Sequence, residues 1–210
     1  MQPNRESFSI VMLGSWNPSI FSTEWVLKHL ADEDESEVEL AYPLDDPTAP
    51  RKITFEGISM FPGRKRLMLN PVEPTVEGME KCAKVAFKII SLLSHTPIGN
   101  MGVNFSFTES ENTNDLDDSF FTPNLTNILG EYVINQASYS RSLSKEGDDF
   151  VLSYSVTQSE ESYTLSYNFN YSQSDVGFYK ECLESDIVKK HYDEAVAFSV
   201  KYHNIELEEG

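Results

Sequence analysis

Apolar residues in the first half of the chain form two kinds of pattern. A nearly continuous apolar run from Phe8 to Leu13 ends at Gly14, and it is short enough to be a strand buried on both faces. Ser22 then precedes a helix predicted over Thr23 to Leu30, because a serine there can cap the first backbone N–H groups. Three segments of alternating polarity follow and predict antiparallel strands. Their apolar positions are Val38, Leu40 and Tyr42; Ile53, Phe55, Ile58 and Met60; and Leu67 and Leu69.

The clearest helix is predicted from Val76 to Ser94, with Thr75 as its cap. Apolar residues at steps of three and four predict its buried stripe, and the opposite stripe is predicted to face solvent. The buried stripe is Met79, Cys82, Ala86, Ile89 and Leu93; the solvent stripe is Glu77, Lys81, Lys84, Lys88 and Ser91. Cys82 is therefore expected to be an inert core thiol.

The second half shows a similar order of patterns. A strand over Met101 to Phe107 is followed by a helix predicted over Pro123 to Ile134. Three alternating segments come next, at Tyr139 to Leu143, Phe150 to Val156 and Tyr163 to Tyr171. A final helix, capped by Ser185, is predicted from Asp186 to Tyr202. Its inward residues are expected to be Ile187, Val188, His191, Ala195, Phe198 and Tyr202.

These elements predict an α+β fold in which each half has the order β-α-β-β-β-α. The prediction is a tandem pseudo-repeat, residues 1–97 and 98–210, with antiparallel sheets packed against two long helices in one compact unit. The halves share no residue-level identity that we can detect, so the duplication is inferred from element order alone.

The chain is strongly acidic. Its net charge is −18, of which residues 1–97 contribute −4 (10 basic, 14 acidic) and residues 98–210 contribute −14 (6 basic, 20 acidic). This balance argues against nucleic acid as a partner, since phosphate binding needs clustered Lys and Arg. No apolar run is long enough to span a membrane and the N-terminal residues are polar, which predicts a cytoplasmic protein.

Two charged regions are candidates for partner binding. The segment from Glu109 to Asp118 is either a solvated loop or a surface for a basic protein, with Asp115, Asp117 and Asp118 as the contacting residues. The chain's basic residues concentrate at Arg51 and Lys52 together with Arg64, Lys65 and Arg66, on adjacent predicted strands. That cluster either receives the acidic surface of another copy or partner, or is a solvated edge that prevents aggregation.

Motifs for catalysis or cofactor binding are missing from the sequence. The four histidines lie far apart with neither cysteine close to them, so no metal site, cofactor or catalytic residue is predicted. Two cysteines are too few for a disulfide framework. The carboxylate pairs Asp117–Asp118 and Asp148–Asp149 stay open as acid–base or cation sites that the fold would have to assemble.

Several aromatic and polar residues have two interpretations. Trp16, Asn17 and Trp25 either anchor the core beside the first helix or line a pocket at the strand end. His95 either caps the long helix or belongs to such a site. Tyr154 and Tyr167, on alternating strands that face the last helix, either fill the core or hold a small apolar ligand.

Three stretches resemble a family of bacterial proteins of about this length. They are Leu13-Gly14-Ser15-Trp16-Asn17-Pro18-Ser19-Ile20-Phe21, which fits "LG-x-x-NP-x-IF"; Leu92-Leu93-Ser94-His95-Thr96-Pro97, which fits "LL-x-HTP"; and Met101-Gly102-Val103-Asn104. The resemblance covers about the first 110 residues and implies a bacterial cytosolic source. It implies no chemistry, because the family has no assigned activity.

Three functions are compatible with these patterns. The leading hypothesis is a noncatalytic binding or regulatory protein that acts through protein–protein contact, as an adaptor, antitoxin-like or immunity-like factor does. The alternative is a small-molecule-binding domain that uses the tyrosine-rich second sheet. An enzyme of unrecognised type is the third hypothesis.

Overall fold

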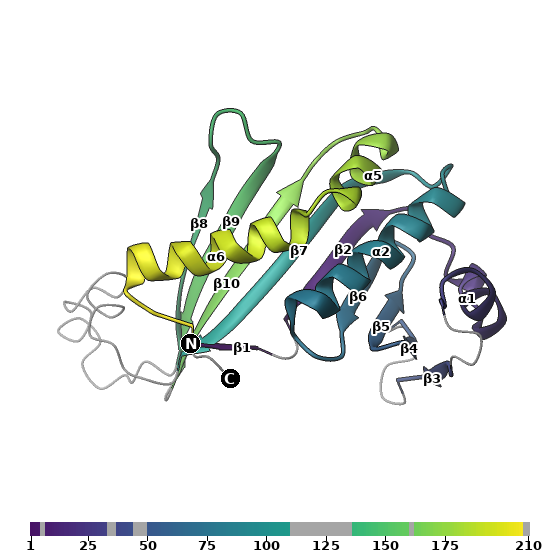
Figure 1. The fold of residues 1–210 in the computed structure, drawn as a ribbon, viewed down its shortest axis with the longest axis horizontal. Coiled ribbons are helices and arrows are strands. Elements are labelled where there is room, and N and C mark those ends of the chain that lie inside the picture. Colours follow the sequence, from purple (N-terminus) through teal and green to yellow (C-terminus); the bar gives the residue numbers. More distant parts are fainter. Residues whose placement is uncertain (5–6, 33–36, 44–49, 110–135, 160–161, 208–210) are drawn as a thin grey trace.

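The strands of both halves join one antiparallel sheet (Figure 1). The computed structural model describes residues 1–4, 7–32, 37–43, 50–109, 136–159 and 162–207. The sheet has ten strands in the order β3-β4-β5-β6-β2-β7-β10-β9-β8, with β1 paired to β7 beside this path. The strands are β1 Gln2–Pro3, β2 Ser9–Gly14, β3 Glu39–Ala41, β4 Lys52–Phe55, β5 Ile58–Pro62, β6 Arg66–Pro71, β7 Ile98–Glu109, β8 Ala137–Leu143, β9 Phe150–Gln158 and β10 Tyr163–Tyr171. The predicted α+β class is confirmed.

Strands β2 and β7 form the central pair, with four strands outward of β2 and three outward of β7. Strands β6, β5, β4 and β3 follow outward on one side, and β10, β9 and β8 follow on the other. The helix expected over Pro123 to Ile134 falls outside the described residues. The duplication of the two halves therefore stays a prediction.

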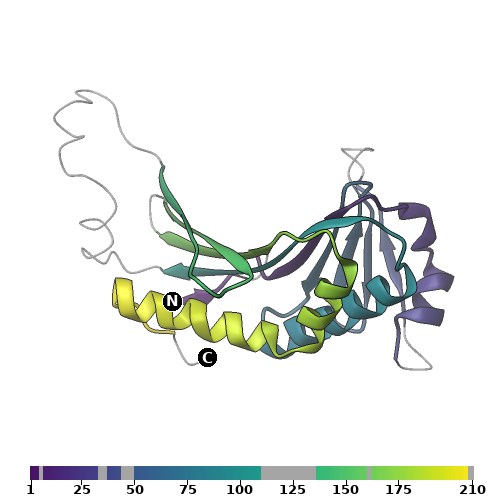
Figure 2. The same cartoon turned by 90° about the horizontal axis from the view of Figure 1, so that it is seen from above.

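Helices cover one face of this sheet (Figure 2). The short 3-10 helix η1 and α1 follow β2, α2 lies over the first half, and α5 and α6 follow β10. Their bounds are η1 Pro18–Ile20, α1 Thr23–His29, α2 Val76–Leu92, α5 Val176–Glu184 and α6 Ile187–His203. None of the helices in the described part of the chain is both long and apolar enough to cross a membrane.

The predicted caps and buried stripe of the first-half helices are confirmed. Ser22 Oγ accepts from the Trp25 N–H at 3.2 Å, and Thr75 Oγ1 accepts from the Gly78 N–H at 3.0 Å. On α2 the predicted stripe is buried, except that Leu93 is half-buried and lies just past the helix end. Cys82 lies in this core, where burial raises its pKa to about 12. The thiol is therefore protonated, as expected of a core residue.

The second-half helices differ from the sequence prediction in three ways. Helix α5 was not expected, and it takes up the chain between β10 and α6. Because Ser185 ends α5, with its hydroxyl donating to the Cys182 carbonyl, the predicted cap of α6 is wrong: Asp186 precedes that helix. Tyr202 was placed on the inward stripe but is 56% exposed, since α6 extends to His203 and the inward position at its end belongs to His203.

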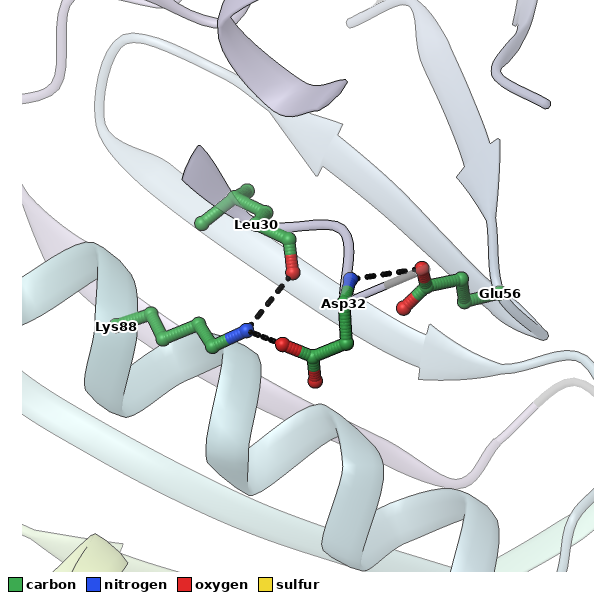
Figure 3. A network of polar contacts seen from close by, with 4 residues as sticks. All are labelled: Leu30, Asp32, Glu56 and Lys88. Carbon is green, nitrogen blue, oxygen red and sulfur yellow. Dashed lines mark hydrogen bonds and ion pairs between the residues drawn. The ribbon is translucent and has the colours of Figure 1, made fainter. Parts of the chain in front are cut away.

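Lys88 was assigned to the solvent stripe of α2; its side chain is 32% exposed, but its charged end contacts another segment of the chain. Its ammonium group donates to the Leu30 carbonyl at 3.1 Å and pairs with the Asp32 carboxylate (Figure 3). The Asp32 N–H in turn donates to Glu56 Oε1 at 2.8 Å. Glu56 and Gly57 both have positive φ, which is the conformation of a tight two-residue hairpin turn between β4 and β5. Lys88 thus ties the end of α1 to α2 and to this turn.

We expect Lys88→Met to lower the free energy of unfolding by about 1 kcal/mol, because the Leu30 carbonyl and Asp32 lose their donor while the aliphatic stem stays packed. Lys84→Met, on the exposed side of the same helix, is the matched control and should change stability by less than about 0.5 kcal/mol. Urea denaturation of both variants measures the difference. Equal effects would show that the network in Figure 3 contributes nothing to stability.

Candidate binding surface

The face of the second-half sheet opposite α6 is built from small uncharged polar side chains. Strand β10 alternates strictly between buried and half-buried residues, so its aromatic side chains face the helix and its Thr, Ser and Asn side chains face away. In register with these residues, strands β7, β9 and β8 also carry Ser, Thr or Asn side chains on the outward side. We call the outward side the polar face.

Strand register arranges the polar face in rows that cross the strands. Side chains opposite one another in adjacent strands lie on the same face and close together. The paired positions trace three rows: Ser9–Asn104–Asn168–Ser153–Ser142, then Ser106–Ser166–Ser155–Ser140, then Thr108–Thr164–Thr157–Ser138. Every member is Ser, Thr or Asn, so the rows carry hydroxyl and amide groups and no charge.

Hydrogen bonds within the rows hold their inner members in place. Asn168 Nδ2 donates to Asn104 Oδ1, and Asn104 Nδ2 donates to Ser9 Oγ at 3.1 Å. In the next row the hydroxyls of Ser106 and Ser166 lie 3.2 Å apart. A glycine at position 102 leaves room for this arrangement, because a Cβ there would lie 2.8 Å from Asn168 Nδ2.

The side chains of the polar face become less exposed from the edge of the sheet toward its centre. Ser142 and Ser153 near the edge are exposed, whereas Ser9 and Ser106 are 7% and 2% exposed. A hollow of about 500 Å³ lies over β2, β7, β10, β9 and β8 and is lined mostly by row members. Arg141 is the charged residue among its described lining residues, and its guanidinium lies 4.8 Å from the ring centroid of Tyr139.

The opposite side of the same strands is a packed aromatic layer. The Tyr154 hydroxyl lies 2.6 Å from His203 Nε2, and the Tyr167 hydroxyl lies 2.6 Å from Ser199 Oγ. Burial raises the pKa of both tyrosines above the ordinary value, so their hydroxyls stay protonated. These contacts place Tyr154 and Tyr167 in the core beneath α6.

The other pocket candidates lie in the first half, away from these tyrosines. Trp16 is 5% exposed, with Nε1 donating to the Met12 carbonyl at 3.1 Å. Asn17 Oδ1 accepts from the Ser19 N–H and begins η1, while Trp25 packs edge-on against Phe21. His95 lies exposed in the turn after α2, whose last backbone bond comes from Leu93 instead.

The charged candidates are only partly placed. Strands β4 and β6 both pair antiparallel with β5, so Lys52 and Arg66 begin their strands at the same end of the sheet. The Arg64, Lys65 and Arg66 side chains are exposed there. Arg51 instead donates from Nη2 to the Pro18 and Phe21 carbonyls, both at 2.8 Å. These hydrogen bonds hold η1 in place.

The acidic candidates Asp115, Asp117 and Asp118 lie outside the described residues. Glu109 was grouped with them as part of a solvated loop, and this is wrong. It ends β7, is 6% exposed, and pairs with the α-amine of Met1 at 3.0 Å.

A second hollow, of about 360 Å³, contains one of the two carboxylate pairs named from the sequence, Asp148–Asp149. Asp148 and Asp149 line it together with Cys182, Asp186 and Lys190, at the junction of α5 and α6. Burial and the nearby Asp149 carboxylate raise the pKa of Cys182 to about 11, which leaves the thiol protonated and a poor nucleophile. The described residues contain no group of three or more His, Cys, Asp or Glu arranged to hold a metal ion.

No family model and no curated protein matches the chain. The resemblance of its N-terminal motifs to a bacterial family therefore stays a prediction.

Proposed function

We propose that the protein is a noncatalytic binding protein that contacts a protein partner through the polar face. The observation that carries the proposal is the absence of charge from three rows of side chains in a chain of net charge −18. Hydroxyl and amide groups both donate and accept, so they can bond to the polar groups of a protein surface at a small desolvation cost. The packed aromatic layer behind them makes the face rigid before binding.

The charge of the chain supports a basic partner, as the sequence also suggested. A field set by the net charge of −18 attracts a basic protein over distances of about one Debye length, while the close contact is made by neutral side chains. This combination suits an adaptor, antitoxin-like or immunity-like factor of the cytoplasm. The small-molecule alternative required space at the tyrosines, and their hydrogen bonds to α6 residues favour the protein-binding proposal over it.

Site-specific photo-crosslinking in the native host tests this proposal. A photoreactive residue at Ser155, on the polar face, is expected to give one discrete adduct with another protein. The same residue at Ser91, exposed on α2, is the control and should give none. Ser153→Glu should abolish the Ser155 adduct, because a carboxylate beside the neutral contact would be buried without a partner. Equal labelling from Ser155 and Ser91, or none from either, would contradict the proposal.

A further inference from the structure

We propose that strand β8 pairs antiparallel with β8 of a second copy of this chain, with Ser140 opposite Ser140 on the two-fold axis. The inference concerns the backbone edge of β8, whose serines also belong to the polar face, and it does not depend on the proposed partner contact. It rests on the position of β8 at the end of the sheet and on the order of its seven residues.

Strand β8 is the last strand of the sheet in the described part of the chain. Of the strands that the structure describes, β9 alone pairs with β8 (Figure 1). Ser138, Ser140, Arg141 and Ser142 are exposed. An exposed edge strand is a template for pairing with another chain, and proteins usually protect such edges with charges, prolines or short strands. The other edge, β3, has only three residues, whereas β8 is longer, contains no proline and carries one charge.

The sequence of β8 is self-complementary about its centre. An antiparallel pair centred on Ser140 places Ser138 opposite Ser142 of the second copy, and Tyr139 opposite Arg141 of the second copy. Ala137 then lies opposite Leu143. One face of the new strand pair carries only serines. On the other face Tyr139 contacts the cationic Arg141, and the apolar residues Ala137 and Leu143 contact each other. Centring the pair on Arg141 would instead oppose two guanidinium groups, which is unfavourable.

Two acidic chains repel each other least where negative charge is absent, as it is in β8. The second half has a net charge of −14, but the one charged residue of β8 is Arg141, and the polar face beside it is neutral. The remaining repulsion between copies is screened by salt. Dimerisation should therefore strengthen with ionic strength, whereas binding to a basic partner should weaken. A two-fold axis perpendicular to the sheet also leaves both polar faces on the same side, where they form one continuous surface.

Disulfide trapping of the purified full chain tests the register. Residues directly opposite in an antiparallel pair have Cα atoms about 4.5–5.5 Å apart, within the range of about 4.4–6.8 Å that a disulfide requires. Ser140→Cys should therefore form a covalent dimer under mild oxidation. Ser138→Cys alone should not, because the two copies of residue 138 would be separated by four residues, or about 13 Å. A mixture of Ser138→Cys and Ser142→Cys chains should form it again.

The unmodified chain is the control for disulfides formed by its own two cysteines, of which Cys82 is buried and Cys182 half-buried. Sedimentation of this chain should show a monomer–dimer equilibrium near about 100 µM that shifts toward dimer when salt is raised, as expected for a contact of one strand pair. A monomer at about 1 mM, or a dimer trapped by Ser138→Cys alone and not by Ser140→Cys, would overturn the proposal.

Discussion

Ile89→Asp is expected to unfold the protein or to lower its free energy of unfolding by several kcal/mol. Ile89 is fully buried in the stripe of α2 that faces the sheet. The substitution removes a large apolar side chain, which costs about 2–5 kcal/mol, and places a carboxylate where it has no partner. Domains of this size have only about 5–15 kcal/mol of stability in total. Urea denaturation followed by circular dichroism measures the loss.

Lys84→Asp is the control on the same helix. Lys84 is exposed, and the same new side chain there should lower the free energy of unfolding by less than about 1 kcal/mol. The comparison separates the effect of burial from that of an aspartate in a helix. Similar losses in both variants would show that the two faces of α2 have been assigned incorrectly.

The sequence predicted the elements whose apolar spacing is regular. Strand β10 and helix α2 are the clearest cases, since burial on one side imposes a period of two on a strand and of 3.6 on a helix. Helix α5 was missed because its nine residues make little more than two turns. Its apolar residues fit a helix but over a span too short to separate a helix from a connecting segment; they are Val176, Phe178, Tyr179, Cys182 and Leu183.

The polar face was missed for a different reason. Apolar residues at every second position predict the buried face of a strand, and the polar residues between them are then expected to face solvent. The available signal was the kind of polar residue: between Ser153 and Asn170 the outward positions are Ser, Thr or Asn, where an ordinary solvent face would include Lys and Glu. The rows themselves need the pairing of β2, β7 and β10, which are far apart in the chain, and no local pattern specifies that register.

Lys88 shows the limit of assigning faces from a helical wheel alone. Its position on α2 is on the polar stripe, and the spacing correctly excludes it from the core. Its partners, the Leu30 carbonyl and Asp32, come from 58 and 56 residues away. A charged side chain on a polar stripe can equally meet solvent or another segment, and only tertiary structure decides which.

Acidification is expected to destabilise the protein through two buried histidines in α6. His191 and His203 are 0% and 6% exposed, and their Nε2 atoms lie 2.6 Å from the hydroxyls of Tyr171 and Tyr154. His191 also stacks on Phe169 with ring centroids 3.9 Å apart. Burial lowers the pKa of His191 to about 3, with Lys190 contributing, and lowers the pKa of His203 to about 4. Both rings are therefore neutral in the folded protein at pH 7.

Because the pKa values of both histidines are lower in the folded protein, its stability must fall as the pH falls. In the unfolded chain a histidine has an ordinary pKa of about 6.5, so between pH 6.5 and pH 4 the unfolded state binds protons that the folded state does not. The contribution of the two neutral histidines to the free energy of unfolding is complete above pH 6.5. It is lost as the pH falls from 6.5 toward their lowered pKa values in the folded protein. Each histidine should contribute a loss of about 2 kcal/mol between pH 7 and pH 5.

His191→Gln isolates one of these contributions. The glutamine can still accept from the Tyr171 hydroxyl but does not titrate, so the variant should be less stable than the unmodified protein at pH 7 and should lose about 2 kcal/mol less between pH 7 and pH 5. Carboxylates contribute equally to both proteins and cancel in the difference. His95→Gln, at an exposed turn, is the control and should keep the full pH dependence. If urea denaturation gives His191→Gln the same pH dependence as the unmodified protein, His191 takes up its proton in the folded state, where the Glu194 carboxylate lies 3.5 Å from its Nδ1.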